Sequence, residues 1–473
     1  MTTELPVAVI GGGPIGLAAA AHLLSRGVAV KLYEAGNAVA TNVRDWGHVR
    51  LFSPWRFNID AAARAILRQH GWQEPQPDGL PTGHELFEAY LAPLAMALMR
   101  HGIIETKARV RSITRHGIDK VVSRDRVKYP FALAIDGQSS GPRIDIVRAV
   151  VDASGTWQCP NPLGASGTPA LGEKDADGHI AYRIPDVFQA DRAEYAGKHT
   201  LVIGGGHSAA NLLLDLCHLA DDANGTRVTW AVRSSDLNRI FGGGVADKLP
   251  ARGKLGIELK RLVEAKRLDL VRGFSTHRVD RRPEGVHISG TTLAGGATLG
   301  PFDRIVALTG QRPDLSITRE LRLDLDPWLE CPRTLGPMID PNLHSCGTVP
   351  PHGYRELSHP EQGYFAVGIK SYGRAPTFLM ATGYEQVRSI AALLSGDERA
   401  ASEVRLVLQE TGVCSVNVAP AESTGCCGGT APETSDACCV ADHLAKETGA
   451  TGCGCSEAAA APAQQKELAT GIA

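Results

Sequence analysis

The 473-residue sequence predicts an α/β protein with two Rossmann-like domains and a flexible cysteine-rich tail. Two glycine-rich motifs, each placed between an apolar strand and a helix, predict the two domains. Two later apolar segments that end in small residues and glycine indicate that both domains are completed in the same way. The tail is indicated by six of the eleven cysteines, which lie between Cys426 and Cys455.

Composition limits the class of protein before any motif is considered. An apolar fraction of 43% fits a globular chain with a sizeable core, and a net charge of −2 provides no basic surface for nucleic acid. The apolar run at residues 5–24 follows Glu4 rather than a basic segment, and three consecutive glycines interrupt it. It therefore reads as a strand, a turn and a helix rather than a signal peptide or a membrane span, and we expect a cytoplasmic protein.

The first motif follows an apolar strand at residues 7–10 and has the pattern Gly11-x-Gly13-x-x-Gly16. The first glycine permits a sharp turn, the second lets the backbone approach a pyrophosphate, and the third lets a helix pack against the strand. The helix should run from about residue 14 to residue 25, with its N-terminus facing the pyrophosphate.

A second strand at residues 28–33 completes this first unit. Glu34 follows that strand at the distance from Gly16 where a carboxylate accepts hydrogen bonds from a ribose 2′-hydroxyl. Because strand, turn, helix and acid occur together, the sequence predicts a dinucleotide site here.

The pattern recurs as Gly204-x-Gly206-x-x-Ala209, but the acid is missing after the following strand. Arg233 and Ser234 stand near its place. A guanidinium there suits a 2′-phosphate, so the second site should prefer NADPH over NADH. The alternative is that Arg233 is a solvated residue at the end of a strand.

Residues 146–157 and 301–314 are the two later segments, and each reads as a buried strand ending in small residues. The first ends in Ser154-Gly155-Thr156, and the second in Thr309-Gly310. A strand that returns beneath a bound dinucleotide needs small side chains at its end. Two copies at matching places support a duplicated unit.

These paired motifs resemble the two-dinucleotide-binding flavoproteins, which include glutathione-reductase-like enzymes and flavin-containing monooxygenases. The resemblance covers roughly residues 1–400 and implies FAD at the first motif and NAD(P)H at the second. It also implies that residues 363–394, with a strand from Tyr364 to Val367 followed by Gly368, complete the FAD domain and cover the flavin.

The resemblance favours the monooxygenase branch, because residues 35–158 contain no cysteine and the core has no Cys-x-x-Cys. The segments WGHVRLFSPW and ASGTWQCPNP look like parts of that branch. Its usual motif before the second Rossmann strand is not intact, since His179 and Tyr182 stand at the wrong spacing. The whole chain most closely resembles flavoproteins encoded beside arsenic-resistance genes, through GIKSYGRAPTFLMATGYEQVRS and the pattern CCGG…DACC…GCGC.

The predicted domains are a first FAD-binding part, an inserted NADPH-binding domain, a completing FAD-binding part, and a linker with the tail, at residues 1–165, 166–335, 336–400 and 401–473. The predicted FAD contacts are Gly11, Gly13, Pro14, Ile15, Gly16, Glu34, Ala35, Val110, Ser154, Gly155 and Gly368, and the predicted NADPH contacts are Gly204, Gly206, His207, Ser208, Ala209, Arg233, Ser234, Thr309 and Gly310.

Two residues near the first motif are candidates for a catalytic role. The resemblance implies an amide donor near the flavin, and Asn58 in SPWRFNID is the candidate, with Arg56 as a contact to flavin or substrate. The alternative for Asn58 is a turn residue ahead of a helix that starts near Asp60.

The tail cysteines are two adjacent pairs and one Cys-x-Cys, at Cys426, Cys427, Cys438, Cys439, Cys453 and Cys455. Structural zinc sites favour wider spacing, whereas flexible thiolate clusters suit soft ions such as As(III), Hg(II) or Cu(I). A thiophilic metal or metalloid site, a thiol electron relay, a zinc site and no role at all stay open.

The resulting hypothesis is an FAD- and NADPH-dependent oxidoreductase, a monooxygenase acting on a soft nucleophile in arsenic or metalloid resistance. One alternative is a thiol-linked metal or metalloid reductase that uses the C-terminal cysteines. The other is an FAD-binding metallochaperone or sensor. The expected partner is a small-molecule substrate, with As(III) or another thiophilic ion at the tail. Nucleic acid and membrane are not expected, and a homodimer is left open.

Overall fold

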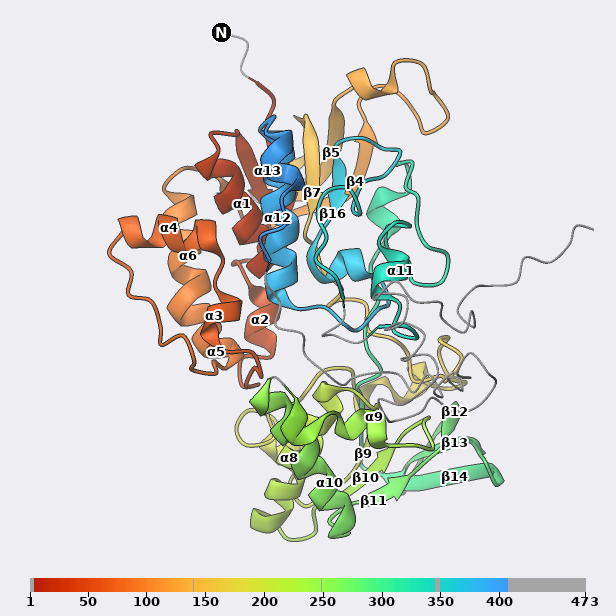
Figure 1. Ribbon diagram of the computed structural model, residues 1–473. Helices are drawn as coiled ribbons and strands as arrows, with labels where there is room; N and C mark the ends of the chain where they lie inside the picture. The colour runs from red at the N-terminus through yellow and green to blue at the C-terminus, as the bar shows by residue number, and fades with distance from the viewer. Residues whose placement is uncertain (1–3, 139, 248, 345–348, 407–473) are drawn as a thin grey trace, which may run out of the picture. The chain divides into compact units, whose positions relative to one another are not determined.

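The computed structural model describes residues 4–138, 140–247, 249–344 and 349–406 (Figure 1). The chain divides at Val416, and the described residues all belong to its first part, Met1–Val416. The predicted tail site, with its six cysteines, lies outside the described residues. Within the described ranges, no helix is long and apolar enough to cross a membrane.

The first of two five-stranded parallel sheets has the strand order β16-β7-β1-β2-β3. Its strands are β1 (Val7–Ile10), β2 (Val30–Tyr33), β3 (Ile104–Glu105), β7 (Ala149–Asp152) and β16 (Tyr364–Ala366). Val7 pairs with Val30 on one side and with Ala149 on the other, so β1 is central. Because parallel strands end at one edge, the segments that follow β1, β7 and β16 come together there.

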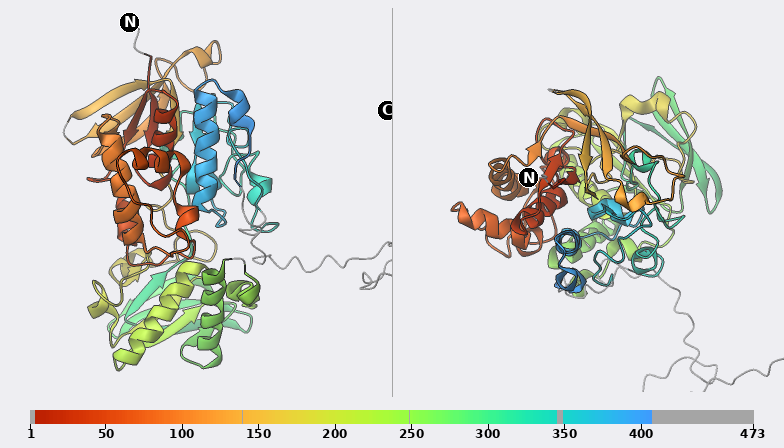
Figure 2. Two further views of the ribbon diagram at one scale, coloured as in Figure 1. Left: turned by 60° about the vertical axis from the view of Figure 1, so that its left-hand side comes forward. Right: turned by 90° about the horizontal axis from the view of Figure 1, so that it is seen from above.

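Helices cover one face of this sheet. They are α1 (Pro14–Ser25), α4 (Ala61–Gln69), α6 (Ala92–Met99) and α12 (Met380–Leu394), with the short helices α2 (Thr41–Asp45), α3 (Trp55–Asn58), α5 (Gly83–Leu86) and α13 (Glu398–Ser402). The run of alanines in α1 is fully buried, which allows α12 to lie beside α1 although residues 26–379 separate the two helices in the sequence (Figures 1 and 2).

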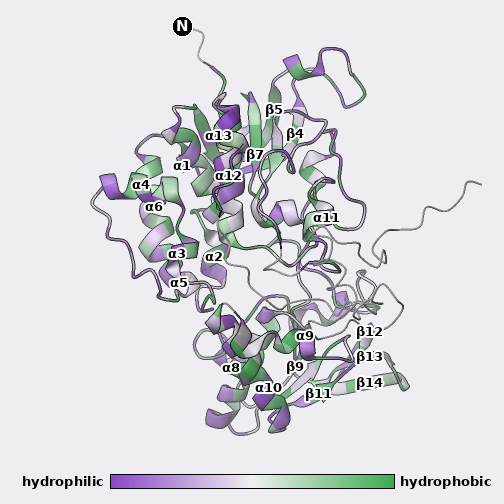
Figure 3. Cartoon of the chain, in the orientation of Figure 1, coloured by the Kyte–Doolittle hydropathy of each residue, from purple (hydrophilic) through white to green (hydrophobic). Residues whose placement is uncertain are grey.

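An antiparallel three-stranded layer covers the other face. It consists of β4 (Ala108–Arg115), β5 (Phe131–Gly137) and β6 (Gly141–Val147). Side chains alternate between the two faces along β1, so this strand packs against both layers. Val7 and Val9 face the helices, whereas Ala8 and Ile10 pack with Ile113 and Leu133 of the antiparallel layer. Figure 3 shows the contrast between the hydrophobic strand β7 and the hydrophilic surface helix α13.

The second sheet repeats this plan with the order β11-β10-β9-β15-β8. Its strands are β8 (Ile180–Ala181), β9 (His199–Ile203), β10 (Arg227–Ala231), β11 (Asp269–Val271) and β15 (Arg304–Ala307). Helices α8 (His207–Asp222) and α10 (Pro250–Glu264) pack on one face, and the antiparallel strands β12 (Ser275–Arg282), β13 (Gly285–Thr292) and β14 (Gly295–Phe302) pack on the other. The predicted α/β fold with two Rossmann-like domains is confirmed.

The boundaries of the returning strands differ from the prediction. Residues 146–157 were expected to form one strand, but Val147 ends β6 and only Ala149–Asp152 returns to the sheet as β7. Likewise, Phe302 ends β14, and β15 begins at Arg304. In both domains the antiparallel layer runs straight into the returning strand, so a continuous apolar segment contains two strands with a break between them.

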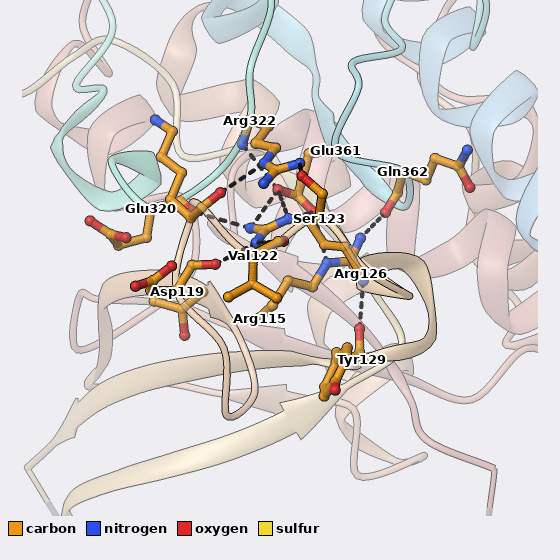
Figure 4. A network of polar contacts seen from close by, with 12 residues as sticks. Arg115, Asp119, Val122, Ser123, Arg126, Tyr129, Glu320, Arg322, Glu361 and Gln362 are labelled. Atoms are coloured by element: carbon orange, nitrogen blue, oxygen red, sulfur yellow. Dashed lines mark hydrogen bonds and ion pairs between the residues drawn. The ribbon is translucent and has the colours of Figure 1, made fainter.

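A buried ion cluster ties β16 to the antiparallel layer (Figure 4). Glu361, three residues before β16, accepts from Arg115 Nε at 2.8 Å and from Arg126 Nη2 at 2.9 Å. Burial alone would raise the pKa of Glu361, but the hydrogen bonds from Arg126, the Arg322 backbone and Arg115 outweigh it and lower that pKa. The cluster fixes where β16 begins, and therefore where Gly368 lies.

Candidate functional site

The first glycine-rich turn has the geometry that the motif predicts. Gly11 has φ +98°, and a Cβ there would lie 2.6 Å from the carbonyl oxygen of Ala153, just after β7. A Cβ on Gly16 would collide with the Gly11 carbonyl. A Cβ on Gly13 would meet nothing within 4 Å, so this side of the turn is open to a ligand. Gly11 thus makes the sharp turn, Gly13 leaves room for a pyrophosphate, and Gly16 lets the helix pack closely, as the motif predicts.

The start of α1 supplies hydrogen-bond donors to the same open side. Gly13 caps the helix in an extended conformation, with Pro14 at the first helical position. The first N–H groups of a helix have no partner within it, and they favour an anion. A pyrophosphate therefore fits the space in front of Gly13.

Glu34 lies at the end of β2, facing the turn. Its carboxylate accepts from the backbone N–H of Gly12 at 2.7 Å and from that of Gly36 at 2.6 Å. Each carboxylate oxygen has a further lone pair, so Glu34 can also accept from ribose hydroxyls. The two backbone bonds hold the carboxylate beside the turn, and Ala35 follows it as a half-buried residue.

The segment after β7 contains a buried ion pair that the sequence analysis missed. Lys370 Nζ lies 2.7 Å from Asp152 Oδ2 and donates to Ser154 Oγ at 2.9 Å. Tyr364 OH also donates to Asp152, at 3.0 Å. An acid that ends an otherwise apolar strand (AVVD) was the available signal for Asp152. No sequence pattern pointed to Lys370.

The three predicted FAD segments meet at one edge of the first sheet. Gly368 has φ +67°, and a Cβ there would lie 3.1 Å from Ile15 in the first turn of α1. Gly155 has φ +72°, and its Cβ would lie 3.8 Å from the side chain of Ile369. The glycine turn, the Ser154-Gly155 segment and the Gly368 turn thus adjoin one another, as a single dinucleotide site requires.

Val110 occupies a different environment from the other predicted FAD contacts. It lies on β4 and is 7% exposed, packed in the core between the first sheet and the antiparallel layer. Its side chain is therefore committed to the core, and its role in cofactor binding stays a prediction.

The second glycine-rich turn repeats the geometry of the first. Gly204 has φ +144°, and its Cβ would collide with the carbonyl of Leu308, just after β15. A Cβ on Gly206 would meet nothing within 4 Å. Helix α8 begins at His207, with Ser208 exposed and Ala209 fully buried against the sheet. This turn therefore offers a second pyrophosphate site.

The polar surroundings of the second turn differ from those of the first. Arg233 is exposed just after β10, and its side chain donates to the carbonyl of Ala165 at 3.2 Å. Ser234 Oγ donates to the Asp236 carbonyl. Burial lowers the pKa of His207 to about 4, with Arg252 adding to the effect, so His207 is neutral at pH 7.

Thr309 and Gly310 lie where the chain leaves β15. Thr309 Oγ1 donates to the Asn161 carbonyl at 2.8 Å, and Asn161 Nδ2 donates to the Thr309 carbonyl at 3.1 Å. Gly310 has φ +89°, a conformation that favours glycine. The two connections between the domains are thus tied to each other beside the predicted NADPH site.

Asn58 is engaged within its own loop. It is 1% exposed, its Oδ1 accepts from Ser53 Oγ at 2.8 Å, and its Nδ2 donates to the Ser53 carbonyl at 2.7 Å. This geometry matches the turn role that was the alternative for Asn58. Arg56 is a partly exposed residue that forms an ion pair with Asp78. A catalytic role for Asn58 or Arg56 stays a prediction.

Three cysteines lie within the described residues, and all are free thiols: Cys159, Cys217 and Cys331. Burial raises the pKa of Cys217 to about 11 and that of Cys331 to about 12, so both are protonated and inert at neutral pH. Cys159 is half-buried. In the described part of the chain, no cluster of three or more metal-ligating side chains occurs.

Comparisons with known proteins agree with this architecture. A family model described as an NAD(P)-binding Rossmann-like domain matches residues 9–73. Its description names NAD(P), whereas we assign FAD to this motif, so the match supports a dinucleotide-binding unit without deciding which dinucleotide binds. Two ferredoxin–NADP reductases of Streptococcus agalactiae are each 24% identical over 219 residues, 46% of this chain. The alignment covers 52% of each relative, so the chain spans about half the length of the curated relatives it matches.

Solved structures of flavoprotein oxidoreductases share the fold. Bacillithiol disulfide reductase from Bacillus cereus has a TM-score of 0.60 at 18% identity and covers 83% of this chain and 99% of its own. The FAD-bound cadaverine monooxygenase from Erwinia amylovora has a TM-score of 0.58 at 14% identity, with 87% and 99% covered. A flavin monooxygenase mutant from Stenotrophomonas maltophilia has a TM-score of 0.54 at 20% identity, with 83% and 98% covered. The fold is therefore that of NAD(P)H-dependent flavoprotein oxidoreductases, in which monooxygenases and disulfide reductases share one architecture.

Proposed function

We propose that the protein is an FAD- and NADPH-dependent oxidoreductase that binds FAD at the first glycine turn and NADPH at the second. The observation that carries the proposal is the meeting of Gly13, Gly155 and Gly368 at one edge of the first sheet, together with a second complete turn of the same geometry at Gly206. One dinucleotide turn would serve many enzymes, but two in one chain suit the transfer of electrons between two dinucleotides.

The residues of the chain bind and orient, while the flavin supplies electron transfer when it is bound. The α1 N-terminus and Gly13 hold one pyrophosphate, and Glu34 accepts from the ribose. The α8 N-terminus and Gly206 hold the other, and Arg233 binds the 2′-phosphate that distinguishes NADPH from NADH. His207 is neutral at pH 7, so it adds no full charge beside the second pyrophosphate.

For the electron acceptor we propose oxygen, with a soft nucleophile such as a sulfur, nitrogen or trivalent arsenic compound as the substrate that is oxygenated. The described cysteines favour oxygen over an internal disulfide as the electron acceptor. Cys217 and Cys331 are buried in separate hydrophobic clusters and therefore do not form a disulfide with each other. The link to arsenic resistance depends on the resemblance of the sequence and on the tail thiols. A thiol-linked metalloid reductase that uses those thiols is the second candidate.

The test is a two-step reduction and reoxidation of the purified full-length protein. Flavin absorbance is followed while NADPH is added without oxygen, and the reduced protein is then mixed with oxygen, with an arsenic(III) compound and oxygen, or with an arsenic or mercury compound alone. A monooxygenase forms oxygenated product in step with the NADPH consumed. Stoichiometric peroxide without product contradicts oxygenation, and reoxidation by the metal compound without oxygen supports the reductase instead.

Truncation after Glu410 separates the tail from the flavin chemistry, because both dinucleotide sites lie before residue 400. The shortened protein should bind FAD and accept electrons from NADPH at the rate of the full chain, while stoichiometric binding of trivalent arsenic is lost. Arsenic binding that survives the truncation would exclude the tail as the capture site. A collapse of kcat at saturating substrate, with normal flavin reduction, would make the tail an electron relay.

A further inference from the structure

The turn that contains Gly368 is held by a closed set of buried hydrogen bonds. Gln386, on α12, accepts from the Gly368 N–H through Oε1 at 2.8 Å. Its Nε2 lies 2.9 Å from His352 Nε2 and donates to Ser371 Oγ at 2.9 Å. Ser371 Oγ in turn donates to the Gly368 carbonyl at 2.7 Å. Gln386 and Ser371 are fully buried, and His352 is 2% exposed.

The donors and acceptors of this set fit together in one way only. His352 Nδ1 lies 3.0 Å from the Pro350 carbonyl, which can only accept, so the Nδ1 atom carries the proton. His352 Nε2 is then an acceptor, and the Gln386 amide nitrogen donates to it. Rotating the Gln386 amide by half a turn would place its NH2 group against the Gly368 N–H. The network thus assigns the neutral Nδ1–H form to His352.

The position of Gly368 matters because its turn, Gly368–Tyr372, borders the first glycine motif. The Gly368 backbone has φ +67° and lies against Ile15, at the start of α1. The same turn carries Lys370, which is bonded to Ser154. A shift of the turn would therefore disturb the segments that surround the FAD site.

We propose that Gln386 and neutral His352 are positioning residues of the FAD site, which hold the Gly368 turn in the conformation that retains FAD, and that protonation of His352 releases it. This inference rests on the proposed binding of FAD. A protonated His352 would point an Nε2–H at the NH2 group of Gln386, and no rotation of the amide satisfies both His352 and Gly368. A buried donor left without an acceptor is costly, so the turn would move.

Burial sets the direction of the response to pH. It lowers the pKa of His352, and the Pro350 carbonyl, Glu356 and Glu385 oppose this effect without cancelling it. Both glutamates have other partners: Glu356 accepts from the Gly353 N–H, and Glu385 is paired with Arg388 at 2.7 Å. The Tyr372 ring also faces His352, with 5.6 Å between the ring centres. His352 is therefore neutral at pH 7, and it gains a proton only at a pH below the ordinary histidine pKa of about 6.5.

The test measures how fast FAD dissociates from the full-length holoprotein between pH 5 and pH 8, by the recovery of flavin fluorescence on dilution. The wild-type rate should rise roughly tenfold or more on acidification, as expected for one lost buried hydrogen bond. His352→Phe removes the acceptor, so dissociation should be fast and independent of pH. Gln386→Glu offers a carboxylate to both the Gly368 N–H and a protonated His352, so its dissociation should be slower at pH 5 than at pH 8.

The matched control is His359→Phe. His359 is also buried, burial also lowers its pKa, and its ring lies 6.0 Å from the Tyr364 ring. Its Nδ1 atom, however, contacts the backbone of Asp324 rather than the Gly368 turn. This variant should keep the wild-type pH profile of FAD dissociation. Circular dichroism at each pH separates loss of the cofactor from unfolding.

The outcomes separate this inference from the proposed function. Wild-type protein that folds but binds no FAD contradicts the proposed function itself. FAD binding with a pH profile that neither His352→Phe nor Gln386→Glu alters contradicts the positioning role alone. If His352→Phe does not fold, the profile of Gln386→Glu still decides, because a purely structural role of the network predicts no inversion with pH.

Discussion

The two Rossmann units have the same backbone and different side-chain chemistry. In both, the first glycine has a positive φ and packs against the carbonyl after the returning strand, Ala153 in one unit and Leu308 in the other. In both, the second glycine faces open space. After the second strand, however, the first unit has Glu34 bonded to its own turn, whereas the second has the exposed Arg233. We therefore propose that the backbone provides a pyrophosphate site in each unit and that the residue after the second strand determines which nucleotide binds.

A second difference, within the described residues, concerns the strand beside the returning strand: β16 follows the first unit in the sequence and continues into the Gly368 turn, whereas β8 precedes the second unit. The Gly368 turn reaches Ile15 there, and buried bonds from Glu361, Lys370 and Gln386 hold that segment in place. This difference suits a cofactor that stays bound in the first site and a nucleotide that exchanges in the second.

Substituting the open glycine in each unit should give the largest effects. Gly13→Val fills the space for the first pyrophosphate and should yield a folded protein without FAD, because an added Cβ meets no protein atom within 4 Å. Gly206→Val should leave FAD bound and remove reduction by NADPH. Flavin absorbance and thermal melting measure both outcomes. Full flavin occupancy in Gly13→Val would show that the first turn does not hold FAD.

Breaking the buried ion cluster should destabilise the first unit. Glu361→Gln leaves Arg115 and Arg126 without their buried counter-charge, which should cost about 3–5 kcal/mol in the free energy of unfolding. The folded-state pKa of Glu361 is lowered, so its contribution is present above the ordinary glutamate pKa of about 4.3 and is lost as the pH falls through the folded value. Denaturant titrations at pH 7 and pH 4 measure both effects.

The exposed pair Arg111–Asp136 provides the control for this experiment. It also joins β4 to β5, but its side chains are 60% and 50% exposed. Asp136→Asn should change stability by less than about 1 kcal/mol. Equal losses in the free energy of unfolding of the two variants would mean that burial does not strengthen the Glu361 ion pairs.

Removing Arg233 should change nucleotide preference without affecting FAD. Arg233→Ala should raise the KM for NADPH roughly 10- to 150-fold, as expected for a lost charge-assisted bond of about 1.5–3 kcal/mol, and should change the KM for NADH little. Arg282→Ala, at an exposed arginine on β12, is a control outside the nucleotide turn. Equal effects of Arg233→Ala on both nucleotides would remove the case for a 2′-phosphate site.

Local pattern predicted the backbone of both sites. The bounds of α1 and the roles of Gly11, Gly13 and Gly16 follow from the motif itself, because glycine spacing encodes backbone geometry. The prediction missed the antiparallel layers, whose first strands lie in segments that were left without an assignment. Those strands gain their stability from packing against a sheet made by distant parts of the chain, so local propensity alone does not reveal them.

The side chains that support the FAD site could not be predicted for the same reason. Lys370 pairs with Asp152, 218 residues earlier in the chain, and Gln386 bonds His352, 34 residues earlier, so no local pattern links these side chains. Asn58 shows the converse: its partner Ser53 is local, and the turn role offered as an alternative from the sequence is the one that its hydrogen bonds favour.

Replacing Asp215 should change the free energy of unfolding of the second Rossmann unit without affecting the first. It lies on α8, and burial raises its pKa to about 6, with His218 opposing and Asp186 adding to this effect. A carboxyl whose pKa is raised in the folded state favours folding below its unfolded pKa of about 3.9, and this contribution is lost as the pH rises towards 6. Asp215→Asn should therefore raise the free energy of unfolding by about 1–3 kcal/mol at pH 7 and change it little at pH 4. FAD binding should not change, because Asp215 belongs to the NADPH unit, whereas a loss of flavin in this variant would show that the two units do not respond independently.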